Sequence, residues 1–345
     1  MPHLISRKKR IYSVRQAFAA YLSQYDRAVS LPVRYEDLLR YVQAIPLYDK
    51  AGRDTLWVSV LYTSQDQAEI REGLMHVYAQ MKAGGDLSAF DHLVVDRVDL
   101  CTYGNTQPFR IRIVNTLNDN FDYFYVKRAD ASRVYGLELE RMLSPNVITY
   151  LFDRDTLVEE HISGIPGNMF IRSYLSDRHL DEVRLAKEFV KFNERCFVRL
   201  LGDMHSANFV IDITPDFEET VYRIRAIDFD QQSYEGKRQV YLPQYFKQNN
   251  PIIFLGVKCM SRETVRQYQL EERSLMRRRM KSSGGRLDDL LSVMAADEIA
   301  PDEHVAALGE QLAEHYGNES FLLAASMGEL VVEHLSMLER PHAGL

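Results

Sequence analysis

The sequence contains little cysteine, no zinc-binding pattern and no long apolar run. Its three cysteines, Cys101, Cys196 and Cys259, lie far apart and form no CxxC pair, so we expect free thiols in a reducing compartment. The ten histidines fall into neither HExxH nor cysteine–histidine spacing, which gives a structural zinc no support. No apolar run approaches the length of a membrane span, and no apolar stretch follows the basic N-terminal residues. We therefore expect a soluble, cytoplasmic protein.

The chain also lacks an excess of basic residues. It has 42 lysines and arginines against 49 aspartates and glutamates, which gives a net charge of −7. Binding to a nucleic-acid backbone needs many basic groups in one place, so we expect no nucleic-acid partner. The 345 residues, of which 46% are hydrophobic, are enough for two domains or one bilobal domain.

Apolar periodicity divides the chain into three parts. Residues 1–90 read as a mixed α/β segment, with helical spacing over 14–42, a strand over 56–63 and a helix over 66–82. Residues 91–162 are rich in strands. We expect the order of three strands, one helix and two strands there, over residues 93–103, 109–116, 122–127, 131–143, 147–152 and 156–162.

Residues 163–345 are mainly helical and contain one predicted hairpin. Helices are expected over 169–175 and 181–201, and the hairpin strands over 209–213 and 221–227. The SSGG sequence at 282–285 reads as a linker before further amphipathic helices. The fold class predicted from these patterns is α+β.

The residues with the clearest chemical meaning lie around the predicted hairpin. In LLGDMHSANFVID, Asp203 precedes Asn208 by five residues, and Asp228 follows in AIDFDQ after the second hairpin strand. Phosphoryl transfer needs a carboxylate near the nucleophile and oxygen ligands for Mg²⁺. We interpret Asp203 as the catalytic carboxylate, with Asn208 and Asp228 as the metal ligands. Taken alone, Asp203 and Asn208 would more often be turn-forming residues than ligands.

The same residues carry a resemblance to a known family. GDMHSANFVI followed by IDFD resembles the GDxHxxN…IDxD pattern of the aminoglycoside phosphotransferase, choline kinase and fructosamine kinase-like branch of the protein-kinase-like superfamily. Protein kinases usually read HRDxxxxN and DFG, whereas here His205 follows the aspartate and phenylalanine-aspartate replaces phenylalanine-glycine. Bacterial kinases that phosphorylate proteins can also carry this pattern.

The resemblance implies a bilobal fold that binds ATP and Mg²⁺. Its parts would be a β-rich N-lobe over 91–162, a mostly helical C-lobe over 163–345, and an α/β extension over 1–90. Within such a fold His205 would support the loop by hydrogen bonding. Asp230 would either bind a second metal ion or cap the next turn.

Residues upstream of the hairpin fit the same resemblance. Lys127 in FYVKRAD corresponds to the lysine of the kinase VAIK strand and would bind the ATP phosphates. Glu138 and Glu140 both lie on the next helix, and of the two we prefer Glu140 as the partner of that lysine. LVEEHISG resembles the hinge, where the Glu160 carbonyl and the Ile162 amide would face adenine.

Two features depart from the kinase pattern. The glycine-rich phosphate loop is reduced to Gly104 in CTYGNTQ, as is common in small-molecule kinases of this type. Glu159 takes the gatekeeper position beside the adenine site, where a charged residue is unusual.

The function that follows is ATP-dependent transfer of the γ-phosphate to a hydroxyl or amine of a small molecule or a protein. One alternative is a bacterial effector- or toxin-type protein kinase, and another is transfer of AMP on the same fold. The last alternative is a pseudokinase scaffold, which uses the fold for binding and catalyses no reaction. We rank the pseudokinase lowest because Lys127, Asp203, Asn208 and Asp228 are all present.

Overall fold

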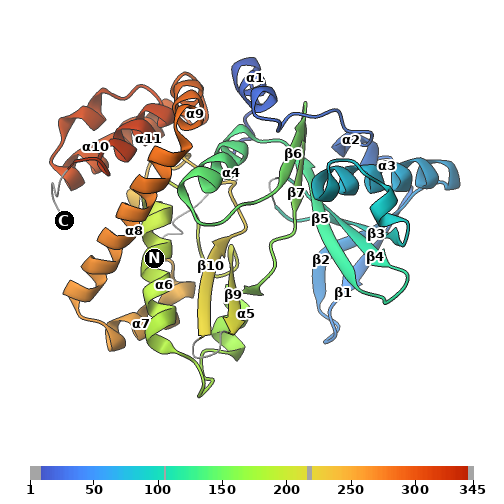
Figure 1. Ribbon diagram of the computed structural model, residues 1–345, viewed down its shortest axis with the longest axis horizontal. Coiled ribbons are helices and arrows are strands. Elements are labelled where there is room, and N and C mark those ends of the chain that lie inside the picture. The colour runs from blue at the N-terminus through green and yellow to red at the C-terminus, as the bar shows by residue number, and fades with distance from the viewer. Residues whose placement is uncertain (1–8, 105, 216–219, 341–345) are drawn as a thin grey trace. The chain divides into compact units, whose positions relative to one another are not determined.

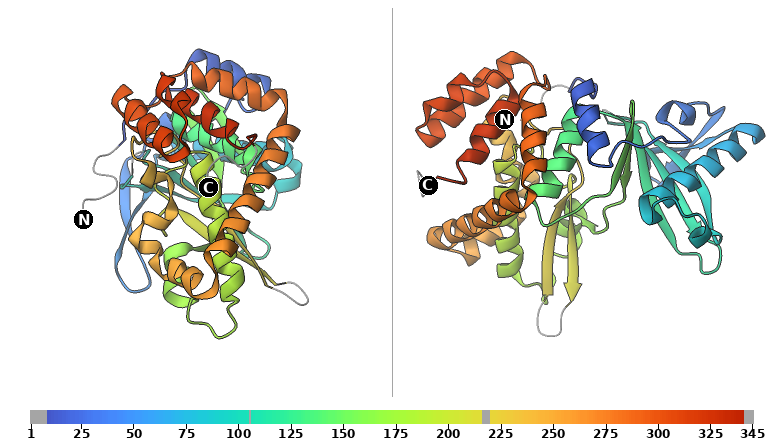
Figure 2. Two further views of the ribbon diagram at one scale, coloured as in Figure 1. Left: turned by 90° about the vertical axis from the view of Figure 1, so that its left-hand side faces the viewer. Right: turned by 45° about the horizontal axis from the view of Figure 1, so that its top comes forward.

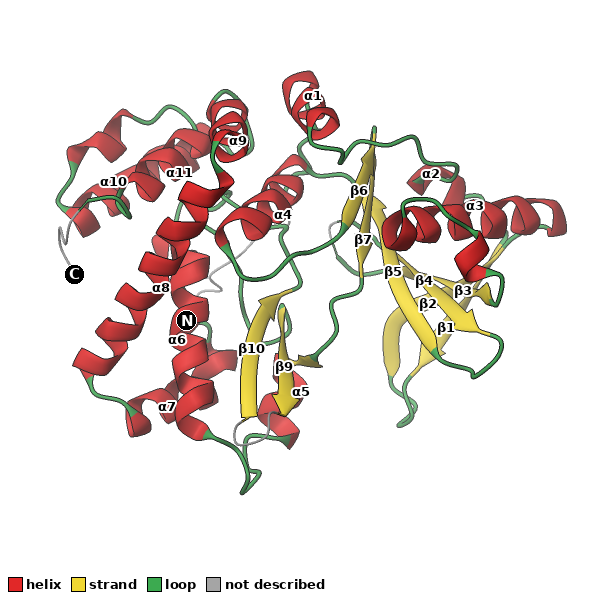
Figure 3. Ribbon diagram, viewed as in Figure 1, coloured by secondary structure: helices red, strands yellow, loops and turns green. Residues whose placement is uncertain are grey.

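The computed structural model describes residues 9–104, 106–215 and 220–340. It is a mixed α+β protein with one large antiparallel sheet, which agrees with the predicted fold class (Figure 3). The described chain forms two compact units. Unit 1 contains residues 9–12, 131–147 and 162–340, and unit 2 contains residues 13–130 and 148–161. No helix in the described ranges is both long and apolar enough to cross a membrane.

Unit 2 is built on a seven-stranded sheet in the order β1-β2-β3-β4-β5-β7-β6 (Figure 1). Each neighbouring pair of strands is antiparallel. The strands are β1 (Gln43–Tyr48), β2 (Asp54–Leu61), β3 (Leu93–Cys101), β4 (Phe109–Asn115), β5 (Phe121–Arg128), β6 (Tyr150–Asp153) and β7 (Thr156–Glu160). The helices are α1 (Gln16–Gln24), α2 (Tyr35–Leu38), α3 (Ser64–Ala83) and the 3₁₀ turn η1 (Ser88–Phe90).

The core of unit 2 lies between α3 and the sheet. The side chain of Thr63 accepts a hydrogen bond from the Asp66 N–H at the start of α3, and Gly84 ends the helix in the left-handed conformation. On β4, burial alternates along the strand, which places Phe109, Ile111 and Ile113 on the face that packs into the core. On α3, the buried residues include Ile70, Leu74, Val77, Tyr78 and Met81, which face this core.

The segment predicted as an N-terminal extension shares this sheet. Strand β2 pairs with β3, and β1 pairs with β2 at the edge, so residues 1–90 contribute two strands to the sheet that contains β3–β7. The sequence did not predict β1, which contains Pro46. Proline is tolerated there because an edge strand needs hydrogen bonds on one side only.

Unit 1 consists of helices around a three-stranded sheet in the order β10-β9-β8. Its strands are β8 (Ile165–Pro166), β9 (Phe209–Pro215) and β10 (Thr220–Ala226). Its α-helices are α4 (Ala131–Leu143), α5 (Gly167–Ser173), α6 (Glu182–Val198), α7 (Asn250–Cys259), α8 (Arg262–Ser283), α9 (Gly285–Ala295), α10 (Asp302–Tyr316) and α11 (Met327–Ser336). Four 3₁₀ segments connect them: η2 (Arg238–Tyr241), η3 (Pro243–Tyr245), η4 (Lys247–Asn249) and η5 (Glu319–Leu323).

Helix α8 packs along α6, and α4 packs against α8 and α9 (Figure 2). The SSGG stretch, predicted as a linker, is instead the tight junction between α8 and α9. Gly284 there has a φ of 48°, which glycine adopts without strain. Helix α4, which the sequence assigned to the strand-rich part, belongs to unit 1, and 12 of its 13 residues are buried.

Candidate active site

The loop between α6 and β9 carries Asp203 and Asn208. An isolated antiparallel bridge joins Leu201 to Gln232, and the Asp203 N–H donates to the Val240 carbonyl at 3.1 Å. These bonds hold the backbone of Asp203 at a φ of 61°, a conformation that residues other than glycine rarely adopt. Strained backbone of this kind concentrates at functional sites.

The hairpin brings Asp228 beside this loop. Asn208 Nδ2 donates to the Asp203 carbonyl oxygen at 2.9 Å and lies 3.4 Å from Asp203 Oδ2. The Ile227 N–H donates to the Asn208 carbonyl at 3.0 Å. This hydrogen bond places the next residue, Asp228, close to Asn208. The three residues that we predicted to act together therefore gather at one end of the β9–β10 hairpin.

Arg133 from α4 holds the two aspartates of the IDFD sequence. Its Nη1 lies 2.8 Å from Asp228 Oδ1 and 2.8 Å from Asp230 Oδ1. The Arg133 side chain is only 3% exposed, and the Asp230 N–H also donates to Asp228 Oδ1 at 3.0 Å. Sequence reasoning missed Arg133 because it lies almost a hundred residues before its partners and belongs to no motif.

The environment of Asp203 makes its carboxyl group unusually easy to protonate. Burial, followed by the negative charges of Asp228, Glu235 and Asp230, raises the pKa of Asp203 from 3.8 to about 7. A carboxylate with a pKa close to neutrality is well matched to accepting a proton during catalysis. Glu235, the second residue missed, follows the two aspartates of the IDFD sequence in a loop and has no sequence signature.

His205 supports the loop, as the resemblance implies. Its Nδ1 accepts a hydrogen bond from the Ala207 N–H at 3.2 Å, and its Nε2 lies 4.0 Å from Asp203 Oδ1. Burial lowers the pKa of His205, although the charge of Asp228 partly opposes this shift. The neutral His205 ring therefore stabilises the turn between Asp203 and Asn208 through its hydrogen bond with the Ala207 N–H.

The raised pKa of Asp203 predicts a pH-dependent stability of the metal-free protein. Between pH 4 and 7 the unfolded chain loses this proton while the folded protein keeps it, so the free energy of unfolding should fall as the pH rises. Asp203→Asn should remove that fall. Urea denaturation of both proteins across this pH range measures the difference. Asp212→Asn, on strand β9, is the matched control, and equal slopes in wild type and Asp203→Asn would contradict the assignment.

In unit 2, Lys127 is paired with Glu159. Lys127 Nζ lies 2.7 Å from Glu159 Oε2, and both residues are buried. Tyr125 and Glu159 are direct partners in the pairing of β5 with β7, and the ammonium group of Lys127 lies 5.4 Å from the centre of the Tyr125 ring. Glu159, the acidic residue at the predicted gatekeeper position, is therefore ion-paired with Lys127, the lysine predicted to bind phosphate.

The helix glutamates have partners within unit 1. Glu140, our preferred partner for Lys127, is ion-paired with Arg199 and accepts a hydrogen bond from Asn146 Nδ2 at 3.1 Å. Glu138 accepts from Arg286 Nη2 at 2.7 Å. These contacts give Glu140 a packing role inside unit 1 that the sequence did not predict.

The remaining predicted nucleotide contacts are spread over both units. Glu160 ends β7, and its Oε1 accepts from the Thr149 N–H at 2.8 Å. Ile162 is buried and begins the next segment of unit 1. Gly104 lies between β3 and β4 with a φ of 109°, which favours glycine. Their predicted contacts with ATP stay predictions.

The donor set of the loop and hairpin suits Mg²⁺. Among the described residues, no group of three or more His, Cys, Asp or Glu side chains could hold a metal ion. Mg²⁺ needs no such group, because it is commonly bound through one or two carboxylates, with phosphates and water completing the shell. The oxygens of Asn208 and Asp228 fit that requirement, and Arg133 competes for one of them.

Removing the competing arginine should strengthen metal binding. We expect Arg133→Met to raise the affinity for Mn²⁺, without nucleotide, by about tenfold, because a cation next to Asp228 is lost. Arg133→Lys, which keeps the charge, should behave like wild type. Isothermal titration calorimetry measures the Mn²⁺ affinity of all three proteins. The same affinity in wild type and a folded Arg133→Met protein would exclude competition at Asp228.

Comparison with known proteins adds no family assignment. No protein-family model matches the sequence, and no curated protein matches it.

Proposed function

We propose that the chain is an ATP- and Mg²⁺-dependent phosphotransferase with a protein-kinase-like bilobal fold, acting in the cytoplasm on a hydroxyl or amine acceptor. The observation that carries the proposal is the gathering of Asp203, Asn208 and Asp228 at one end of the β9–β10 hairpin. The raised pKa of Asp203 supports it, since a proton acceptor works best near its own pKa.

Each residue has a distinct role in this proposal. Bound Mg²⁺-ATP supplies the transferable phosphoryl group and the cation that neutralises its charge. Asp203 accepts the proton of the acceptor hydroxyl or amine and orients that group. Asn208 and Asp228 hold the cation through their side-chain oxygens. Lys127, kept in place by Glu159, binds the nucleotide phosphates.

Incubation of the purified protein with ATP labelled at the γ or the α position tests the proposal. We expect γ-label on a small molecule when a metabolite extract is added, and none from α-labelled ATP. Label on a protein would point to a protein kinase. Label from α-labelled ATP would replace phosphoryl transfer by AMP transfer. An absence of both label and nucleotide binding would overturn the enzymatic proposal in favour of a scaffold.

A further inference from the structure

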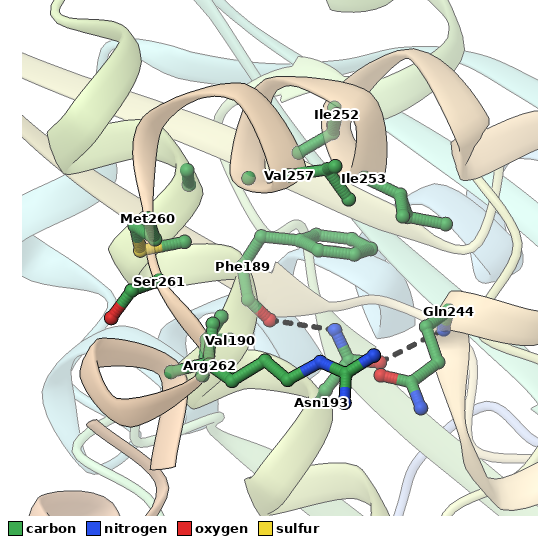
Figure 4. Close-up of a pocket in the computed structure, with 13 residues that line it drawn as sticks. Phe189, Val190, Asn193, Gln244, Ile252, Ile253, Val257, Met260, Ser261 and Arg262 are labelled. Carbon is green, nitrogen blue, oxygen red and sulfur yellow. Dashed lines mark hydrogen bonds between the residues drawn. The ribbon is translucent and has the colours of Figure 1, made fainter. Parts of the chain in front are cut away.

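Unit 1 contains an apolar cavity that none of the predicted site residues lines. It lies among α6, α7 and the first turn of α8, and has a volume of about 610 Å³. Phe189 lies on one side of it, facing Ile252 and Ile253 of α7 (Figure 4). A volume of this size falls within the ~300–1,000 Å³ range of small-molecule sites.

The cavity is open to solvent on one side, and most of its lining residues are apolar. A cavity with such walls also offers water few hydrogen-bonding partners. The two buried polar atoms of the Asn193 side chain are already satisfied, because Nδ2 donates to the Phe189 carbonyl and Oδ1 accepts from the Gln244 N–H. The interior of the cavity therefore suits the apolar part of a ligand.

Its rim carries one charge. Arg262 is the only ionisable residue that lines the cavity, and its exposed side chain extends toward Gln244 (Figure 4). Arg262 forms no ion pair with any carboxylate of the described residues. The nearby charges of Lys258 and Glu182 neutralise each other at 2.7 Å. Arg262 also begins helix α8, whose first turn carries one acidic residue, Glu263.

We propose that this cavity binds a free, single-chain amphiphile with an anionic head, such as a medium-chain carboxylate. The hydrocarbon chain occupies the space between Phe189 and α7, and the carboxylate accepts hydrogen bonds from the Arg262 guanidinium at the rim. The charge of Arg262 selects an anionic head group, and the apolar lining selects a hydrocarbon chain. The proposal does not depend on phosphoryl transfer.

Titration of the full-length protein with decanoate, octanoate and decan-1-ol, below the concentrations at which they form micelles, tests the site. We expect one saturable decanoate site. Octanoate should bind about sixteenfold more weakly, because each buried methylene contributes about fourfold in affinity. Arg262→Met should weaken decanoate about tenfold and leave decan-1-ol unchanged.

Gly256→Leu is the second variant because it adds side-chain volume to the cavity lining at a position where a Cβ meets no clash. A Cβ at Gly256 would lie 3.4 Å from Met260 Cε and 4.0 Å from Ala186 Cβ, which are ordinary contacts. Leucine also favours a helix more than glycine does, so this variant should fold well. It should lose decanoate binding.

Four outcomes would overturn the proposal. They are non-saturable uptake of decanoate, decanoate binding that survives Gly256→Leu, equal decanoate affinity in Arg262→Met, and binding to anionic lipid vesicles without binding to free decanoate. The last would replace a free amphiphile by a membrane surface.

Discussion

Replacing Asp203 with asparagine is expected to lower the rate of phosphoryl transfer at least a hundredfold. The amide keeps the shape of the side chain and its place beside Asn208, but it cannot accept the acceptor's proton. Proton transfer by a positioned side chain contributes about 10²–10⁴-fold to enzymatic rates. Turnover of γ-labelled ATP with the acceptor found in the labelling experiment measures the loss.

The control for this experiment lies on the same hairpin. Asp212→Asn changes a carboxylate on β9 that belongs to neither the loop nor the IDFD sequence, and it should keep wild-type turnover. Asp228→Ala should lose at least as much activity as Asp203→Asn, through loss of a metal ligand. Wild-type turnover in Asp203→Asn, with an unchanged circular dichroism spectrum, would contradict the site assignment.

Replacing Glu140 with alanine is expected to destabilise the protein by about 3–5 kcal/mol. The change leaves the guanidinium of Arg199, whose side chain is 1% exposed, buried without its carboxylate. Breaking a buried ion pair by removing one partner costs about that much, and the charge of Glu272, which also acts on Arg199, places the expected loss toward the lower end of this range. Urea denaturation followed by far-ultraviolet circular dichroism measures the loss.

Two further variants show which role Glu140 has. Removing both charges, in Glu140→Leu with Arg199→Met, should recover most of the stability, because apolar residues can replace a buried pair at little cost. Glu182→Ala, at the exposed pair with Lys258, should leave the midpoint unchanged. Weaker ATP binding in Glu140→Ala with unchanged stability would instead favour its predicted role as the partner of Lys127.

The sequence predicted best where the decisive contacts are local. Asp203 and Asn208 are five residues apart on one loop, so their contact follows from the loop alone. The helix over residues 131–143 was predicted with the bounds that α4 has, because its apolar pattern is strong and its length typical. The hairpin was also predicted, since two short β-rich runs flank a polar turn.

Prediction failed where the chain breaks its own pattern. Helical spacing over residues 14–42 predicted a helix, but the structure has only α1 and the short α2 there. Asp26 adopts a positive φ of 56° and Pro32 lies between the two helices, so the backbone leaves the helix despite its apolar spacing.

Partners that lie far apart in the sequence could not be predicted. The contacts of Arg133 with Asp228 and Asp230 depend on how α4 packs within unit 1, and no spacing reports that. Glu159 was noticed only as an unusual residue. Its pairing with Lys127 depends on the register between β5 and β7.

The order of the two units along the chain has a consequence for synthesis on the ribosome. All strands of the seven-stranded sheet have been made once residue 161 has emerged, so this unit can fold while the rest is still being translated. Helix α4 emerges earlier, but its neighbours α8 and α9 begin only at Arg262 and Gly285. This helix, 12 of whose 13 residues are buried in the folded protein, must therefore wait for more than a hundred residues to be added, and we expect chaperones to bind the nascent chain there.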